Sequence, residues 1–373
     1  MLLVEKIVQI GVGQAGCNIV SELEQFNFNA FYINTSLEDL NTINTDKKNK
    51  YHIKNSNGLS KDRSAALQCV LKDNNAENIA YAINDQFSMT DIIFFCYSLS
   101  GGTGGGMSGY IIEQFKDLFP DKIINVIAIL PKSNEDVGLQ ANAIEALEHL
   151  KKLQSDGIVT QIHLLDNNTR ENVFSINNDF AISLNKFVNF DQINKTGKLD
   201  ENEKERLLKE PGMGVILDFS NEDFGNGLAD VSSNTIYAKW LRNPSLHGLI
   251  LNKKQNIDLN KQLIKDLLGM ATYTHQTEWE DEGNIIISVG MDFNDNILNQ
   301  MKKNAQELLE KKKQIEEESR KEIIETIEFD TKQITRKSSK RTPINDEQRN
   351  IGASRRRRSS EKTSSILDKY RNM

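Results

Sequence analysis

Short apolar runs alternate with longer polar stretches over the first half of the chain. The runs KIVQIGVG, AFYINT, DIIFFCYSL, INVIAILP and IVTQIHLLD occupy residues 6–13, 30–35, 91–99, 124–131 and 158–166. Unbroken Val, Ile and Phe runs of this length suit strands that are buried on both faces, and the intervals between them can hold crossover helices. The pattern therefore predicts an α/β fold with a parallel, doubly wound sheet.

The pattern changes after Asp166. Phe180, Leu184 and Phe187 are spaced at helical intervals without a helix breaker, which predicts one central helix. Beyond it, the runs VILDF, GLILN and NIIISVGM alternate with the helical NKQLIKDLLGM and predict a second, smaller α/β domain. A long charged helix follows, and the apolar periodicity is lost near Thr331, so we expect a disordered tail.

These changes divide the chain into five predicted parts. They are a first α/β domain, a central helix, a smaller α/β domain, a C-terminal helix and a tail, at residues 1–174, 175–193, 194–295, 296–330 and 331–373. The tail carries 13 Lys or Arg and 4 Asp or Glu, a local charge of +9, against −16 for residues 1–330. An acidic body with a basic tail indicates that an anionic polymer or an acidic partner binds the tail.

The cysteines and the N-terminus indicate a cytoplasmic protein. Cys17, Cys69 and Cys96 form no CxxC pair, so neither a disulfide framework nor a zinc site is expected. The N-terminal MLLVEKIVQIGVG contains a charged pair and runs directly into a glycine loop, unlike a secretory signal. No apolar run reaches the roughly 18 residues that a membrane-spanning helix needs.

The first glycine loop, GVGQAGCN, contains Gly11, Gly13 and Gly16 and lies between a predicted strand and a predicted helix. This GxGxxG spacing brings backbone amides and a helix N-terminus close to a phosphate. Taken alone, the loop fits a tight strand-to-helix turn equally well, and it does not identify the nucleotide.

Two common nucleotide-binding classes lack support. A dinucleotide-binding enzyme should place an Asp or Glu at the end of the second strand, where this chain has Asn34, Thr35 and Ser36, and Glu38 comes only later. The GxxxxGK[ST] pattern of ATPase P-loops is also absent from the sequence. A nicotinamide enzyme and a P-loop ATPase are therefore both disfavoured.

A second glycine loop, SLSGGTGGGMSG at residues 98–109, follows the strand that ends near Leu99. Its position between an apolar run and the helical YIIEQFKDLF argues against a flexible linker. Two such loops in one sheet can grip a di- or triphosphate from both sides, with Thr103 adding a hydroxyl. We expect the phosphates to be the groups that exclude side chains from this loop.

Both loops resemble those of the tubulin/FtsZ family. Residues 100–106, SGGTGGG, resemble the family's second-loop signature, and GQAGCN at residues 13–18 is similar to the first loop of tubulins. Gly105 departs from the usual Ser, Ala or Thr. The resemblance implies that the ligand is GTP or GDP and that it is bound by Gly11, Gly13, Gln14, Ala15, Gly16, Cys17, Asn18, Ser100, Gly101, Gly102, Thr103, Gly104 and Gly105.

The resemblance implies further contacts outside the glycine loops. Asn34 matches the family's Asn after the second strand, and Glu135 matches its ribose-binding Glu, whereas Leu139 replaces an expected Arg. Asn167 resembles a base- or ribose-binding Asn. Without the family, Glu135 and Asn167 would be read as solvated loop residues.

On the central helix, the resemblance implies that Phe180 stacks on guanine, although a core position fits it equally well. Asn178 or Asp179 would then read the guanine edge, and two registers remain possible. NSNGLSKDR at residues 55–63 resembles the loop that senses the γ-phosphate, although its motif is poor.

The catalytic acids implied by the resemblance are Asp200 and Glu203, at the family's DxxE spacing, with Lys198 in place of an Asn. Residues three apart at a helix start share a face, so both carboxylates can polarise one water. In this family they act on the nucleotide of the next subunit, with Mg²⁺ on the phosphates. The resemblance therefore implies head-to-tail filaments. The alternative is an acidic first turn that stabilises the helix dipole.

The basic tail contains Arg355, Arg356, Arg357 and Arg358. This arrangement is similar to the TubZ-type tubulins, which segregate plasmid and phage DNA through a DNA-bound adaptor. Direct binding of the tail to nucleic acid or to an anionic membrane is an alternative. An FtsZ-like division filament and a non-polymerising nucleotide-dependent enzyme remain as alternative functions.

Overall fold

The computed structural model describes residues 2–54, 56, 58–59, 61–190, 199–220, 223–252, 257–279 and 283–337. The chain divides into two compact units, Met1–Lys313 and Gln314–Met373. The first unit contains the sheet and all the site residues discussed below. Lys198 and the arginines at positions 355–358 lie outside the described residues.

The first unit is built on one sheet that, in the described part of the chain, has ten strands in the order β3-β2-β1-β4-β5-β6-β7-β10-β8-β9. The first six are parallel, as predicted. They are β1 (Ile7–Val12), β2 (Asn29–Asn34), β3 (Lys50–His52), β4 (Ile92–Ser98), β5 (Ile123–Leu130) and β6 (Gln161–Asp166). The remaining four are β7 (Gly212–Phe219), β8 (Leu246–Asn252), β9 (Tyr273–Trp279) and β10 (Asn284–Met291).

The sequence predicted a second, smaller α/β domain for the last four strands, but not how these strands pair. Strand β7 pairs with β6 through Gln161–Gly212 and Ile162–Met213, so one continuous sheet results. Strand β10 is antiparallel to both β7 and β8, which makes the sheet mixed. The sequence pattern missed this because buried strands give the same unbroken apolar runs in either direction.

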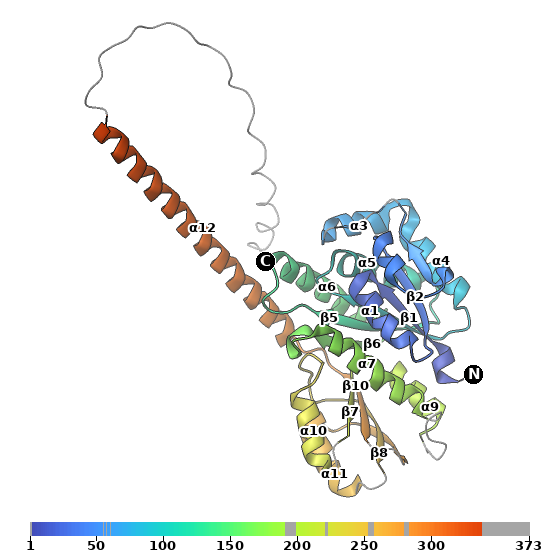
Figure 1. The fold of residues 1–373 in the computed structure, drawn as a ribbon. Helices are drawn as coiled ribbons and strands as arrows, with labels where there is room; N and C mark the ends of the chain where they lie inside the picture. Colours follow the sequence, from blue (N-terminus) through green and yellow to red (C-terminus); the bar gives the residue numbers. More distant parts are fainter. Residues whose placement is uncertain are drawn as a thin grey trace. The chain divides into compact units, whose positions relative to one another are not determined.

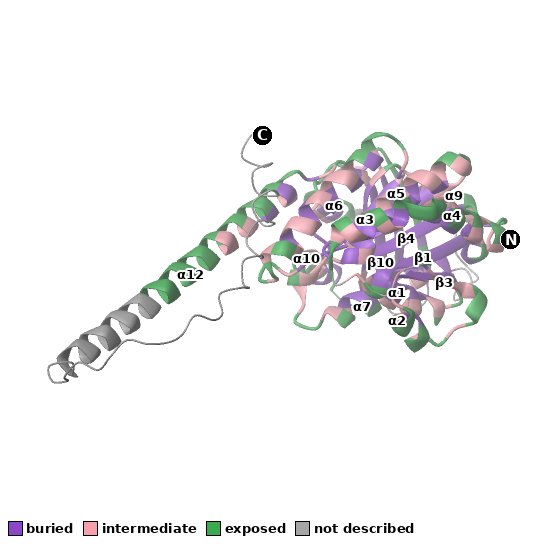
Figure 2. Cartoon of the chain, turned by 90° about the horizontal axis from the view of Figure 1, so that it is seen from above, coloured by how far each residue is buried: buried purple, intermediate pink, exposed green. Residues whose placement is uncertain are grey.

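Helices cover both faces of the sheet, and Figure 2 shows the strands between α3–α6 on one side and α1, α2 and α7 on the other. The helices around the first six strands are α1 (Gly13–Glu24), α2 (Leu37–Thr42), α3 (Arg63–Leu71), α4 (Asn75–Gln86), α5 (Gly102–Leu118) and α6 (Val137–Ser155). Those that follow are α7 (Val173–Val188), α9 (Glu201–Lys209), α10 (Phe224–Ser233) and α11 (Ile257–Leu268) (Figure 1). The predicted central helix corresponds to α7, whose Phe180, Leu184 and Phe187 are fully buried.

The last helix, α12 (Asn296–Lys337), begins in the first compact unit, where Leu298 and Met301 are buried. It is described through Lys337, beyond the expected end at residue 330. The reason is that no Gly or Pro occurs between Asp292 and Thr342 to end it. None of the described helices is both long and apolar enough to cross a bilayer.

Candidate functional site

The two glycine loops lie side by side at the carboxyl ends of neighbouring strands. Strand β1 ends at Val12 and α1 begins at Gly13, while β4 ends at Ser98 and α5 begins at Gly102. Because β1 and β4 are paired in parallel, their ends meet at the same edge of the sheet. A Cβ placed on Gly13 would lie 3.1 Å from the amide nitrogen of Gly104.

A cavity of about 410 Å³ opens between these loops. The N-termini of α1 and α5 both border it, so backbone N–H groups and two helix dipoles favour an anion there. Its described lining consists of Val12, Gly13, Gln14, Ala15, Asn34, Thr35, Ser36, Asp39, Gly58, Leu59, Lys61, Ser98, Gly101, Gly102, Thr103 and Gly104.

The protein's own atoms exclude side chains from most of these glycine positions. A Cβ on Gly16 would overlap the carbonyl oxygen of Cys96, and one on Gly105 would overlap that of Leu99. A Cβ on Gly102 would lie 2.8 Å from Cα of Lys61. The expectation that phosphates alone exclude side chains is therefore wrong. The contact with Leu99 also accounts for glycine at position 105, where a Ser, Ala or Thr would not fit.

Gly101 is the exception in this loop. The nearest atom to a Cβ placed there, the Ser98 carbonyl oxygen, is 3.8 Å away. Gly101 lines the cavity and precedes the first turn of α5 as its N-cap residue. It is thus the glycine whose missing side chain leaves space for a ligand rather than for the protein.

Side-chain hydrogen bonds connect the second glycine loop to β2, α3 and α6. Thr103 Oγ1 lies 2.8 Å from Thr35 Oγ1, across the cavity edge between α5 and the end of β2. Arg63, the first residue of α3, donates to the carbonyl oxygen of Gly105 and, at 3.1 Å, to Glu145 of α6. Arg63 ends the segment 55–63 that resembles the γ-phosphate loop, but its contacts were not predicted, because its partners are distant along the chain.

Lys61 lies in the segment 55–63 that resembles the γ-phosphate loop, and the structure places it, with Gly58 and Leu59, at the cavity. Among the described residues around the cavity it is the one cation, and Asp39 is the one acid. Lys61 has a φ of 63°, a left-handed conformation that is rare for residues other than glycine and often marks a functional site. Asn142 of α6 donates to its carbonyl oxygen at 3.1 Å, which holds the loop at the cavity.

Apart from Phe180, the predicted nucleotide-binding residues fall into three groups. Those that line the cavity are Gly13, Gln14, Ala15, Asn34, Gly101, Gly102, Thr103 and Gly104. Those that are buried behind the lining are Gly11, Gly16, Cys17, Ser100 and Gly105, while Asn18 is half-buried in α1. Burial raises the pKa of the Cys17 thiol to about 12, so this side chain is a neutral core group.

Glu135 and Asn167 form the third group, in the loops after β5 and β6. Glu135 accepts a hydrogen bond from the backbone N–H of Lys132 at 3.0 Å. The neighbour of Asn167, Asn168, connects the two loops: its side chain accepts from Ser133 N–H at 2.7 Å and donates to the Pro131 carbonyl at 3.1 Å. Neither predicted residue lines the cavity as described.

Phe180 is a core residue and is not exposed for stacking. Its side chain is fully buried, and its ring centroid lies 5.7 Å from that of His163 and 6.5 Å from that of Tyr237. Phe174, in the first turn of α7, is instead 61% exposed. The sequence carried a signal for this, because Phe174 falls on the opposite face of the helix from Ile176 and Phe180.

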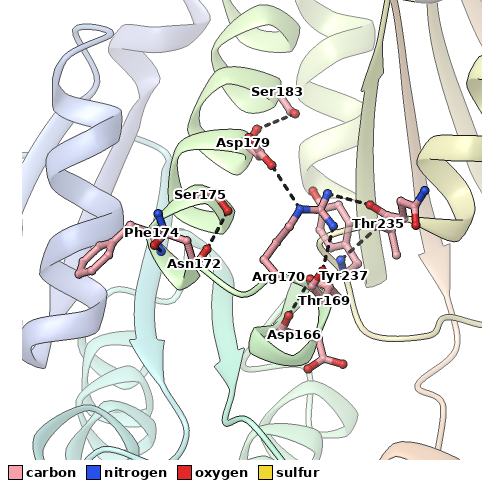
Figure 3. A network of polar contacts seen from close by, with 11 residues as sticks. Asp166, Thr169, Arg170, Asn172, Phe174, Ser175, Asp179, Ser183, Thr235 and Tyr237 are labelled. Carbon is pink, nitrogen blue, oxygen red and sulfur yellow. Dashed lines mark hydrogen bonds and ion pairs between the residues drawn. The ribbon is translucent and has the colours of Figure 1, made fainter.

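The contacts of α7 also separate Asn178 from Asp179. The Asp179 carboxylate lies 3.9 Å from Arg170, on the side of the helix away from the Phe174 ring (Figure 3). Burial raises the pKa of Asp179, partly offset by Arg170. Asn178 is exposed and four residues after Phe174, so these two side chains share a face of the helix.

Asp200 and Glu203 form the N-terminal cap of α9. Asp200 Oδ1 accepts the Glu203 N–H at 2.8 Å, and Glu203 Oε2 accepts the Asp200 N–H at 3.1 Å, a capping box. The helix-stabilising alternative considered for this pair is therefore realised. Asp200 is nevertheless exposed, which leaves it accessible to a second molecule.

Helix α9 lies at the opposite end of the parallel strands from the cavity. Lys6 is the last residue of the 3₁₀ turn η1 (Leu3–Lys6), which precedes β1, and it forms an ion pair with Glu205 of α9. Asn125, near the start of β5, donates to the Leu208 carbonyl at 2.8 Å, and Gln161, the first residue of β6, donates to that of Leu207 at 3.0 Å. Figure 1 shows α9 beside the N-terminus, and no described residue of α9 lines the cavity.

Comparison with known proteins agrees with this geometry. The sequence pattern of the Tubulin/FtsZ family GTPase domain matches residues 6–173. The chain is 30% identical over 328 residues to the tubulin-like protein TubZ of a Clostridium botulinum C phage, covering 87% of this chain and 90% of that one. The solved structure of tail-truncated TubZ from C. botulinum phage c-st is 28% identical and superposes with a TM-score of 0.76, over 83% of this chain and 99% of that one.

A more distant structure shows the same fold. A GTPγS-form protofilament of Bacillus thuringiensis serovar israelensis TubZ is 16% identical and has a TM-score of 0.67, covering 83% of this chain and 93% of that one. The phage relative is 30% identical and aligns with 90% of its own length, and the matched GTPase domain includes both glycine loops. The chain therefore belongs to the tubulin/FtsZ family of GTPases.

Proposed function

We propose that this chain is a GTP-dependent filament protein that hydrolyses GTP at the contact between successive subunits. One observation supports this proposal. The cavity lies at the carboxyl ends of the parallel strands, and Asp200 lies at their amino ends, so the two parts of the proposed site face opposite directions in one subunit. Head-to-tail stacking brings Asp200 of one subunit to the cavity of the next. Such a contact is heterologous and extends without closing.

In this proposal the phosphates bind the backbone amides of the two glycine loops. Thr103 and Lys61 add a hydroxyl and a positive charge on the side where the γ-phosphate would lie. Glu135 and Asn167, in the loops after β5 and β6, are proposed to contact the ribose. Phe174 replaces Phe180 as the stacking ring, and Asn178 reads the guanine edge, because both are exposed on one face of α7.

Magnesium is proposed to bind together with the nucleotide. Among the described residues, no group of three or more His, Cys, Asp or Glu side chains can hold a metal. Asp39 lines the cavity, and Mg²⁺ commonly combines one or two carboxylates with substrate phosphates. The residues therefore fit the ion, which when bound would neutralise phosphate charge during phosphoryl transfer.

Assembly can be followed directly by light scattering. With GTP and magnesium, scattering should rise above a threshold protein concentration and decay as GTP is consumed, because hydrolysis weakens the contact between subunits. GDP should produce no rise. Equal scattering with GTP, with GDP and without nucleotide would contradict the proposal.

The finer role that we propose is segregation of plasmid or phage DNA through a DNA-bound adaptor. It is supported by the similarity to TubZ of a phage and by the +9 charge of residues 331–373. Deletion of residues 331–373 should leave GTP-dependent assembly intact and abolish co-sedimentation of filaments with adaptor-loaded DNA. If the truncated filaments still bind adaptor-loaded DNA, the tail is not the binding segment. If the full-length filaments bind bare DNA or anionic vesicles, the tail binds these directly and needs no adaptor.

A further inference from the structure

Thr35 connects two segments that border the cavity, the second glycine loop and the segment that leads to α3. Its hydroxyl oxygen, Oγ1, lies 2.8 Å from Oγ1 of Thr103, the second residue of α5. Its carbonyl oxygen accepts a hydrogen bond from the backbone N–H of Gly58 at 3.0 Å. Thr35 is only 1% exposed, although it lines the cavity. One buried residue therefore contacts both segments.

Hydrogen bonds to its carbonyl group hold Thr35 in place. Besides the N–H of Gly58, Nε2 of His52 and Oγ of Ser56 each lie 3.1 Å from the Thr35 carbonyl oxygen. A carbonyl oxygen only accepts hydrogen bonds, so Nε2 of His52 carries the hydrogen and donates it. The side chain of Thr is branched at Cβ and therefore stiff about χ1. The position of the Thr35 hydroxyl is thus set by the protein before any ligand binds.

Thr103 can contact a ligand directly. It is half-buried, lines the cavity and lies in the first turn of α5, where backbone N–H groups have no partner within the helix. While the cavity holds no ligand, either hydroxyl of the Thr35–Thr103 pair can be the donor. An ionised phosphate oxygen only accepts, so Thr103 must donate its one hydrogen to it. Thr103 then accepts at the other side, and Thr35 becomes the donor.

We propose that Thr35 is a positioning residue for nucleotide binding, which directs the hydroxyl hydrogen of Thr103 at a phosphate oxygen. Thr35 donates to Thr103 and Thr103 donates to the phosphate, so that each hydrogen bond of the chain strengthens the next. The bond to the phosphate is charge-assisted, whereas Thr35 acts only through Thr103. This inference rests on the proposed function, because it assumes that the phosphates bind between the two glycine loops.

The test measures binding of a fluorescent GTPγS analogue to the full-length chain, at protein concentrations too low for assembly. Thr35→Val keeps the branched shape and removes the hydroxyl, so it should weaken binding by about fivefold. Thr35→Ser keeps the hydroxyl and should bind within about twofold of wild type. Thr90→Val is the matched control and should bind as wild type does. Thr90 is also buried, and its hydroxyl donates to the Phe87 carbonyl at 2.8 Å, before the start of β4.

A double variant tests whether Thr35 acts through Thr103. Thr103→Val should weaken binding by about tenfold, because it removes a hydrogen bond to a charged group. Thr35→Val/Thr103→Val should bind no more weakly than Thr103→Val alone. Wild-type affinity in Thr35→Val, no recovery in Thr35→Ser, an equal loss in Thr90→Val or multiplied losses in the double variant would each overturn the inference. A wild-type chain that binds the analogue but does not assemble with GTP would instead refute the proposed function and leave this inference standing.

Discussion

The two glycine loops and the start of α9 are built in different ways. Backbone contacts fix the loops: Gly16 packs on the Cys96 carbonyl, Gly105 on that of Leu99, and neither position has space for a Cβ. Side chains fix the acid end, where Asp200, Glu203 and His275 form a partly exposed hydrogen-bonded set. In the proposed function, the end that binds nucleotide is therefore preformed by the backbone, whereas the end that would act on a neighbouring subunit can be altered without disturbing the core.

The glycine loops should tolerate substitution only where the structure leaves space. Gly105→Ala should destabilise the protein by about 3 kcal/mol or more and abolish GTP binding, because overpacking against backbone cannot relax easily. Gly101→Ala is the matched control for stability in the same loop, because its Cβ would meet no protein atom closer than 3.8 Å, and it should change stability by less than about 0.5 kcal/mol. Urea denaturation and titration with a fluorescent GTP analogue measure both. A similar loss of stability in the two variants would mean that the loop is not fixed by backbone contacts.

At the acid end, the same kind of change should leave the fold intact. Asp200→Asn should retain GTP-dependent assembly, while turnover falls about 100-fold or more and the filaments persist. Asp223→Asn is the matched control, because Asp223 is also a helix N-cap, at the start of α10. Phosphate release and sedimentation measure the two effects. An equal decrease in turnover in both variants would indicate that the Asp200 carboxylate has no specific role in hydrolysis, since Asn caps a helix as well as Asp does.

The two phenylalanines of α7 should respond in opposite ways. Phe174→Ala should weaken guanine nucleotide binding by about 1–2 kcal/mol through lost stacking, with little change in stability. Phe180→Ala should cost about 3–5 kcal/mol of stability, because it leaves a cavity in the core. Nucleotide titration and urea denaturation separate these outcomes. Unchanged affinity in Phe174→Ala would exclude it as the stacking ring.

The smallest expected change concerns Lys61. Lys61→Met should weaken GTP binding by about fivefold and GDP binding by less, since one charge contact near the surface contributes about 1 kcal/mol. Lys47→Met, at another exposed lysine, provides the control for a lost charge. If GTP and GDP affinities fall equally, Lys61 does not distinguish the γ-phosphate.

The sequence predicted what depends on local pattern. The apolar runs predicted the parallel strands, and the glycines after two of these runs predicted the loops. The helical spacing around Phe180 predicted α7. The proposed base contact, Phe174, was not predicted, because periodicity identifies the buried face of a helix but not which exposed aromatic side chain lies near a ligand. Lys61, Arg63 and His275 depend on contacts between residues far apart in the chain, and a sequence does not display those distances.

The shared site between subunits is tested by measuring the GTPase rate per chain across a range of wild-type protein concentrations, with magnesium present. If Asp200 acts on the nucleotide of the next subunit, turnover should be close to zero below a threshold concentration and should rise steeply above it. A rate per chain that is constant from the most dilute to the most concentrated sample would show that one chain hydrolyses GTP alone, and would contradict the account.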